Sequence, residues 1–414
     1  MPEFNLWITL IIVVAVIGFV LNTVAYLILA ERKVAAWVQD RLGPNRVGPW
    51  GLLQPIVDGG KMFLKEEVIP AHVDKVFFLL APMVAFGTAM LAIAVVPFGA
   101  TTPPPPPVAL HGDPAAALQQ YADAQTAYQK DFSFVIAPGL DIGMLYSFAI
   151  GSLAVYGVIL AGWSANNKYS LLGALRSSAQ IISYEIPMGM SIVGVLLFSG
   201  SLNLETIIAQ QANNHWNVFF QPLAFLLFLV SVFAECNRLP FDLPESEQEL
   251  VGGYHTEYSS LKLGMLLLAE YAHMITTSFM MSCVFLGGWS LFGLENQATG
   301  IAGWVLKLAI LAGKMFSFIG LFLLVRWTIP RFRFDQLMSL AWKVMIPLSL
   351  MHLVACLFVR QFHMPLWSLT VISLSLFVMA GLWGAVTGGN VTAPRRRVAK
   401  QPVGLQLGVT YASR

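Results

Sequence analysis

Nine apolar runs, each long enough to cross a bilayer, constrain this chain more than any other feature of its sequence. A helix needs about 20 residues to cross a ~30 Å hydrocarbon core, and the runs lie near residues 5–30, 76–97, 140–163, 180–200, 217–235, 262–288, 303–327, 341–359 and 364–389. Because each run is continuous rather than alternating, and lipid offers no partner to an open sheet edge, helices are favoured over a barrel. The chain is 57% hydrophobic and 11% charged, against ~25% charge in an average soluble domain. We therefore predict an all-α polytopic membrane protein with about nine transmembrane helices.

The charged residues indicate the orientation. The first span lacks a basic leader and ends in Glu31-Arg32-Lys33, so we expect a permanent span rather than a cleaved signal. With nine spans, one side holds 20 of the 24 lysines and arginines, in segments 31–75, 164–179, 236–262, 326–343 and the C-terminal tail. Because cytoplasmic loops are enriched in these residues, we predict a cell inner (plasma) membrane protein with the N-terminus outside and the C-terminus in the cytoplasm. The net charge of +2 gives no indication of nucleic acid binding, and the basic tail is most simply an anchor near anionic headgroups.

The chain divides into four regions. Residues 1–97 hold the first two spans and an amphipathic segment on the cytoplasmic side. Residues 98–139 are an outer-side insertion, in which TTPPPPPV favours a stiff polyproline spacer. Residues 140–360 form the core membrane domain with an acidic cytoplasmic loop at 236–262, and residues 361–414 add a C-terminal span and a basic cytoplasmic tail.

Cysteine and histidine spacing excludes several kinds of cofactor site. Cys236, Cys283 and Cys356 are far apart, and the seven histidines form no HExxH motif. This spacing predicts no metal site, whether a cysteine-bound iron–sulfur cluster or a structural zinc. A P-loop and a dinucleotide fingerprint are also missing from the sequence. We therefore expect no catalytic residue in this chain and any redox cofactor in partner subunits.

The segment from Gly51 to Glu67 is amphipathic at helical spacing. The apolar residues share one side of this helix: Leu52, Leu53, Ile56, Val57, Phe63 and Leu64. The polar residues share another side: Gln54, Asp58, Lys61 and Lys65. This pattern predicts an interfacial helix at the membrane surface. Two interpretations of its polar face remain open: it is solvated, or it lines a cavity. The nearby Arg41 and Arg46 favour the cavity.

Three carboxylates lie within or at the ends of apolar runs. Glu185 lies in the fourth span, Glu235 ends the fifth, and Glu270 lies eight residues into the sixth. A charge at the bilayer centre costs roughly 2.5–3.5 kcal/mol on insertion scales, so such acids face protein or water. The pattern predicts a proton relay, and its alternative for Glu185 is a structural ion pair with Arg176 or Arg238.

Between the fifth and sixth spans the acidic series continues with Glu245, Glu247, Glu249 and Glu257. Acids two residues apart do not share one helix face, so part of this loop is expected to be irregular. A simple solvated loop would explain the first three of these glutamates.

The other charged or titratable residues have simpler explanations. The basic, aromatic segment 326–343 is explained by anchoring of the chain at the cytoplasmic membrane surface. Lys314 in the seventh span is explained by snorkelling or by pairing with an acid, and His273 and His352, which have no visible partner, by packing in the core.

Four segments together resemble one known family. They are AERKVAAWVQDRLGPNRVGPWGLLQPIVDGGKMFLKE, RSSAQIISYEIPMGMS, AECNRLPFDLPESEQELVGGYHTEYS and RFRFDQLMSLAWK. In this order they are similar to the signatures of the H subunit of the bacterial proton-pumping NADH:quinone oxidoreductase, the counterpart of subunit 1 of mitochondrial respiratory complex I. The resemblance covers most of residues 5–360. It implies a membrane-arm subunit that forms much of the quinone tunnel at the junction with the peripheral arm and couples quinone reduction to proton pumping.

The resemblance also implies roles for particular residues. Quinone-binding or junction positions are Arg32, Arg46, Asp58, Lys61, Arg238, Phe241, Asp242, Glu245 and Glu247, and the buried proton path is Glu185, Glu235, Glu249, Glu257 and Glu270. The implied substrate is a quinone, either ubiquinone or menaquinone, with NADH, FMN and iron–sulfur clusters only in partner subunits. The implied partners are other membrane-arm subunits and the peripheral-arm subunits of the quinone site. The proline-rich insertion and the long C-terminus depart from the family.

Two other functions remain open from the sequence. One is the membrane anchor of a related ion-translocating hydrogenase or formate hydrogenlyase, against which the full GPNRVGPWGLLQP and PFDLPESEQELVGGYHTEYS segments weigh. The other is a stand-alone secondary transporter or a structural scaffold. A transporter would be active when purified alone, whereas one member of a larger complex would be inert.

Overall fold

The regular structure of the chain is helical wherever the structure describes it. A computed structural model describes residues 6–98, 119–120, 122–124, 142–213, 215–243, 251–292 and 300–388. The long helices are α1 (Leu6–Val38), α3 (Lys75–Ala92), α5 (Gly143–Ser164), α6 (Lys168–Ser199), α9 (Pro222–Glu235), α11 (Ser260–Phe285), α12 (Gly300–Thr328), α14 (Ile346–Gln361) and α15 (Trp367–Gly388). The shorter helices are α2 (Gln54–Leu64), α7 (Leu204–Asn213), α8 (Asn217–Phe220) and α13 (Phe334–Leu340). The predicted all-α class is confirmed.

Each of the nine apolar runs overlaps one of the long helices. Among the described residues, six stretches are long and apolar enough to cross a membrane: Leu10–Val38, Lys75–Val95, Gly143–Ser164, Lys168–Ser199, Ala302–Thr328 and Phe334–Gln361. The helices Pro222–Glu235 and Trp367–Leu382 are apolar but shorter. The chain is therefore a multi-pass membrane protein, and the number nine stays a prediction.

In two places the helical structure begins well before its apolar run, at α6 and at the helix that continues into α14. α6 starts at Lys168 because the side chain of Asn167 accepts a hydrogen bond from the Tyr169 backbone N–H at 3.0 Å and caps the helix. The stretch before α14 continues through a π-helical segment, Ala341–Met345, into α13. Both starts contain polar residues, so a search for apolar runs does not find them.

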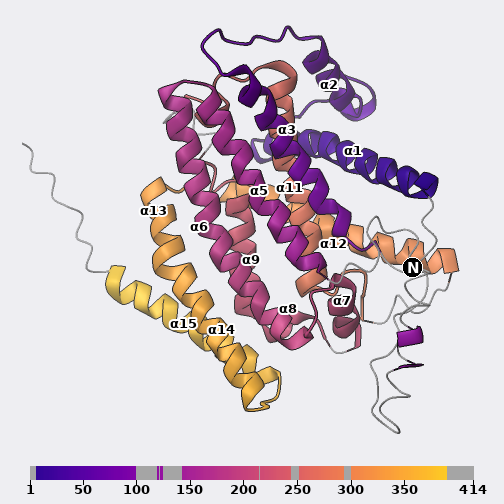
Figure 1. The fold of residues 1–414 in the computed structure, drawn as a ribbon, viewed down its shortest axis with the longest axis vertical. Coiled ribbons are helices and arrows are strands. Elements are labelled where there is room, and N and C mark those ends of the chain that lie inside the picture. The colour runs from indigo at the N-terminus through magenta and orange to yellow at the C-terminus, as the bar shows by residue number, and fades with distance from the viewer. Residues whose placement is uncertain are drawn as a thin grey trace, which may run out of the picture.

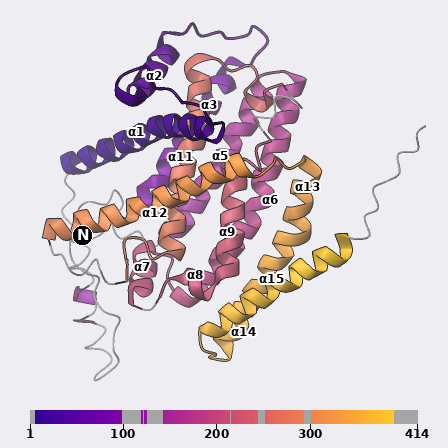
Figure 2. The ribbon, with the colours of Figure 1, turned by 180° about the vertical axis from the view of Figure 1, so that it is seen from behind.

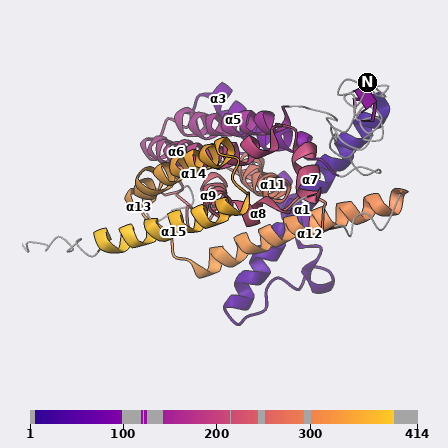
Figure 3. The ribbon, with the colours of Figure 1, turned by 90° about the horizontal axis from the view of Figure 1, so that it is seen from below.

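The helices form a bundle that two of them cross obliquely. α3 packs on α5 and α11, while α6 packs on α5, α9 and α14. Gly157 allows the close approach of α3 to α5, because a Cβ there would lie 2.9 Å from the backbone nitrogen of Ala85. α1 and α12 run at a steep angle to the others (Figures 1 and 2). Viewed from below, α9 and α11 lie in the interior, between α3, α5 and α6 on one side and α12 on the other (Figure 3).

The predicted amphipathic segment is helical and lies beside the bundle (Figure 1). The Ser260 hydroxyl at the start of α11 donates to the carbonyl oxygens of Met62 at 2.9 Å and Lys65 at 3.0 Å, which holds the end of α2. The apolar side of α2 is not covered by the residues that the structure describes, since Phe63 is 74% and Leu64 89% exposed. This face is therefore free to contact lipid, a ligand or another subunit.

Candidate functional site

Glu235 is the last residue of α9, and the turn that follows it is held from α6. The side-chain amide of Gln180 donates to the carbonyl oxygens of Ala234 at 2.7 Å and Phe241 at 2.8 Å. Gln180 thus ties together both ends of the turn. Because the turn is held in this way, Glu235 and Arg238 keep fixed directions relative to α6.

Glu235 contacts His273 of α11. The His273 Nε2 atom lies 2.7 Å from Glu235 Oε1. The exposed fraction of the side chain is 12% for Glu235 and 11% for His273. The sequence-based expectation for His273 is wrong in one respect, because this buried histidine has a carboxylate partner. Gly151 of α5 lies beside the pair, since a Cβ there would be 3.4 Å from Glu235 Oε1 and 3.9 Å from His273 Cε1. Three helices therefore meet around this pair.

A cavity of about 50 Å³ joins the pair to Glu270 and Tyr254. The Tyr254 hydroxyl donates to Glu270 Oε1 at 3.1 Å. A second cavity of about 30 Å³ also borders Glu235 and His273. One water molecule needs roughly 10–15 Å³ of such space, so both cavities are large enough for water. Glu235 Oε2 and His273 Nδ1 have no hydrogen-bond partner among the described residues, and water normally satisfies buried atoms of this kind.

Glu185 lies close to this group but does not line either cavity. It is partly buried in α6 and accepts a hydrogen bond from the Ser152 hydroxyl of α5. Ser152 follows Gly151, which borders both cavities. The sequence-based alternative, an ion pair with Arg176 or Arg238, is wrong within the described residues. The structure thus groups Glu235 with Glu270 directly and Glu185 through α5.

Glu31 forms a buried charge cluster that the sequence did not single out. It is 8% exposed, and its carboxylate lies 2.7 Å from Arg326 Nη1 and 3.7 Å from Arg238 Nη1. The Tyr271 hydroxyl donates to it at 2.7 Å, and Arg238 lies 3.9 Å from the centre of the Tyr271 ring. One carboxylate therefore joins α1, α11, α12 and the turn after α9.

Phe241 and Asp242, predicted at the quinone junction, are enclosed at the end of that turn. Asp242 is 2% exposed, and its Oδ2 lies 2.9 Å from Arg331 Nη2. The Phe241 ring packs against Tyr184 at 5.3 Å and Phe332 at 5.6 Å between ring centres. The turn is thus fastened to α6 and to the segment between α12 and α13.

Three other predicted junction residues, Arg32, Asp58 and Lys61, lie together on α1 and α2. Asp58 Oδ2 is 2.6 Å from Arg32 Nη1, and its Oδ1 is 3.8 Å from Lys61 Nζ. Gln54 also donates to Asp58 at 2.9 Å. Arg46 is exposed in the preceding loop. The structure brings Arg32, Asp58 and Lys61 together, and it keeps them separate from the buried Arg238 and Asp242.

Replacing Asp58 by asparagine is expected to leave stability nearly unchanged. Its partner Arg32 is 50% exposed, and exposed ion pairs contribute at most about 1 kcal/mol. If this face contacts the quinone that the sequence resemblance implies, the KM for that quinone should rise roughly two- to fivefold with kcat unchanged. Steady-state kinetics and thermal unfolding of the whole complex measure both effects. Asp74→Asn, on the cap of α3, is the control, and an equal KM in both variants would contradict a ligand-facing Asp58.

The loop before α11 is anchored through its final residues. Glu257 Oε1 accepts a hydrogen bond from Asn167 Nδ2 at 2.7 Å and lies 3.9 Å from His72 Nε2. Tyr258 stacks on Phe78 at 4.1 Å and donates to its carbonyl oxygen at 3.2 Å. Burial raises the pKa of Tyr258 to about 12, so its hydroxyl keeps its proton. Glu245, Glu247 and Glu249 lie outside the described residues.

Lys314 of α12 holds the end of α11. Its ammonium donates to the carbonyl oxygens of Leu286 at 2.6 Å, Gly288 at 2.8 Å and Ser290 at 2.6 Å. It also lies 4.5 Å from the centre of the Trp216 ring. Carbonyls at a helix C-terminus carry partial negative charge. Lys314 therefore binds the backbone at the end of α11, a contact that the sequence analysis did not predict.

The fold and these enclosed charges define a multi-pass α-helical membrane protein with ionisable groups between its helices. Residues 10–357 match the family model described as NADH dehydrogenase, and the chain belongs to this family. It is 46% identical over 349 residues to the NADH-quinone oxidoreductase H subunit 1 of Cytophaga hutchinsonii. The aligned region is 83% of this chain and 94% of that protein. The chain is 44% identical over 347 residues to the corresponding H subunit of Flavobacterium johnsoniae, covering 83% and 92%, and 47% identical over 342 residues to the H subunit 2 of Geobacter metallireducens, also covering 83% and 92%. The resemblance found in the four sequence segments is confirmed.

Proposed function

We propose that this chain is a membrane-arm subunit of a proton-pumping NADH:quinone oxidoreductase. In that complex it would form the quinone-access tunnel at the junction with the peripheral arm and couple quinone reduction to proton translocation. The family match and the relatives named as H subunits of NADH-quinone oxidoreductase support the assignment. The observation that carries the coupling role is the cavity shared by Glu235, Glu270 and His273.

The quinone entrance lies at α2 in this proposal. A quinone has a polar head and a long apolar tail, and α2 offers a face for each part. Its polar side carries Asp58 and Lys61, and its uncovered apolar side carries Phe63 and Leu64. The bound quinone is the substrate, while NADH, FMN and the iron–sulfur clusters belong to partner subunits.

The coupling step acts through the turn that follows Glu235. Quinone reduction and protonation change the charge near this turn, which contains Arg238 and Asp242. Gln180 ties the turn to α6, so a shift of the turn together with α6 would move the Glu235 carboxylate relative to His273 on α11. The carboxylate then exchanges its proton with water in the cavity, and Glu270 accepts or donates the next one. A switch of this kind requires the quinone to interact differently with two states of the turn.

The orientation in the membrane completes the proposal. The segments at the α2 end of the bundle carry most of the lysines and arginines, which supports a cytoplasmic location for that end. The N-terminus then lies outside, the C-terminus lies in the cytoplasm, and the membrane is the cell inner membrane. Peripheral-arm subunits would dock at α2 and at the acidic loop.

Filling the cavity tests the proposal without removing a charged group. In Gly151→Val, the new side chain starts 3.4 Å from Glu235 Oε1 and occupies space available to water. Leaving a buried carboxylate unsolvated costs about 1–3 kcal/mol, so quinone reduction and proton translocation should fall together by roughly tenfold. Both are measured in the assembled complex after reconstitution into vesicles.

The matched control is Gly87→Val in α3, where an added Cβ meets no atom within 4 Å. This variant carries the same change of helix propensity and should keep normal rates. NADH oxidation by ferricyanide, which bypasses the quinone, should be normal in both variants. Equal quinone reductase rates and proton yields in the two variants would contradict a role for the cavity.

A further inference from the structure

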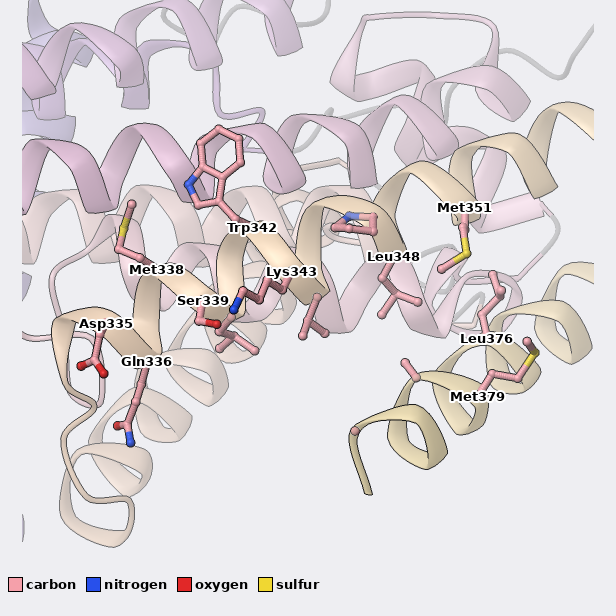
Figure 4. A pocket seen from close by; sticks show the side chains of 15 residues that line it. Asp335, Gln336, Met338, Ser339, Trp342, Lys343, Leu348, Met351, Leu376 and Met379 are labelled. Atoms are coloured by element: carbon pink, nitrogen blue, oxygen red, sulfur yellow. The ribbon is translucent and has the colours of Figure 1, made fainter. Parts of the chain in front are cut away.

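A second, larger space lies far from these carboxylates, between the last helix and the rest of the bundle. It is an open groove of about 1450 Å³ between α15 and the continuous helix formed by α13, the π-helical segment and α14. Figure 4 shows Met351 on one wall and Leu376 and Met379 on the other. The family match ends at residue 357, so the α15 wall lies outside it.

The groove closes partway along the helices. Beyond Met351, α14 and α15 are in contact through Cys356, Val359 and Leu369, which are buried together. Along this continuous helix the groove runs from Asp335 to Met351, and its apolar part beyond Lys343 spans eight residues, or about 12 Å of helix. A bilayer core is ~30 Å thick, so this length matches about one leaflet.

The open end of the groove is polar, whereas its depth is apolar. Asp335, Ser339 and Lys343 lie at this end, and Leu348 and Met351 lie deeper (Figure 4). Lys343 is exposed, so its ammonium is available to a ligand. This order of polar and apolar groups matches a molecule with a charged head and an apolar tail that enters from one membrane surface.

The charge at this end favours an anionic head. Lys343 provides one cation there. Asp335 is the one acid among the described residues that line the groove. It lies in the first turn of α13, where the helix dipole offsets part of its charge. Each basic residue near a membrane surface strengthens the binding of anionic lipid.

We propose that this groove binds an anionic phospholipid, with its phosphate at Lys343 and an acyl chain between α14 and α15. The lipid fills the space that the two diverging helices leave and so joins α15 to the bundle. This site is separate from the proposed quinone entrance at α2, and it does not depend on the proposed function.

The intact complex, purified and depleted of lipid in detergent, provides the test. Phosphatidylglycerol and a diacylglycerol with the same acyl chains are added as probes, and bound copies are counted by native mass spectrometry. Lys343→Gln should weaken phosphatidylglycerol binding about fivefold and leave diacylglycerol binding unchanged. Lys343→Arg should keep both affinities. Lys75→Gln, at the exposed start of α3, is the control for loss of one positive charge.

A second pair of variants tests the groove wall. Ala380→Phe places a ring in the groove, whereas Val378→Phe adds the same ring at a residue that does not line it. Only Ala380→Phe should lower the binding of both probes. The proposal is overturned if Lys343→Gln and Lys75→Gln bind phosphatidylglycerol equally, or if Ala380→Phe has no effect. It is also overturned if photo-crosslinking from Met379→Cys captures another subunit in place of lipid.

Discussion

Replacing Glu235 by glutamine is expected to reduce quinone reduction by about a hundredfold in the assembled complex. A side chain that transfers protons in a rate-limiting step typically contributes 10²–10⁴-fold, and the amide of glutamine does not take up a proton. The new side chain has nearly the same shape, so the contacts of α9 remain and assembly should be normal. NADH:quinone reductase rates and proton uptake by vesicles measure the loss, with ferricyanide reduction as the internal control.

The same experiment with His273→Gln shows whether the two residues act as one unit. If they do, the double variant should be no slower than Glu235→Gln alone, because either change already breaks the 2.7 Å contact. Glu66→Gln, an exposed acid after α2, is the control for loss of one negative charge. Normal quinone reduction with a normal proton yield in Glu235→Gln would end the relay assignment.

The role of His273 shows what a single sequence reveals and what it hides. His273 follows Glu270 by three residues, so the two share one face of α11, and this spacing is a usable signal. Its partner Glu235, however, is 38 residues away on another helix. Packing of α9 against α11 brings them together, and apolar runs alone do not define that packing. Glu235 and Glu270 are visible in the sequence because an acid in or beside an apolar run stands out by itself.

The charged end of the first span gives a second example. The sequence shows Glu31, Arg32 and Lys33 as one group, and taken alone this group indicates only the end of a span. Successive residues of a helix point about 100° apart, given 3.6 residues per turn, so neighbours in sequence need not share an environment. In the structure Glu31 points to Arg326 inside the bundle, and Arg32 points to Asp58 on α2. The path of α12 decides the environment of Glu31, and that path is a tertiary property.

Removing the carboxylate of Glu31 should have the largest effect on stability. In Glu31→Leu, the buried Arg238 and the partly buried Arg326 lose a shared counter-charge. Removing one partner of a buried ion pair costs about 3–5 kcal/mol. The complex should therefore assemble poorly and unfold at a lower temperature, as measured by the yield of intact complex and by thermal unfolding. Glu66→Gln should behave as wild type in both measurements.

A double variant separates the lost charge from lost packing. In Glu31→Leu combined with Arg326→Leu, a carboxylate and a guanidinium 2.7 Å apart are both replaced by apolar side chains. Replacing both partners of a buried pair is often nearly neutral. We therefore expect the double variant to be more stable than Glu31→Leu alone, with Arg238 still stacked on Tyr271. A double variant that is less stable by the sum of the two single changes would instead show that Glu31 and Arg326 stabilise the bundle independently of each other.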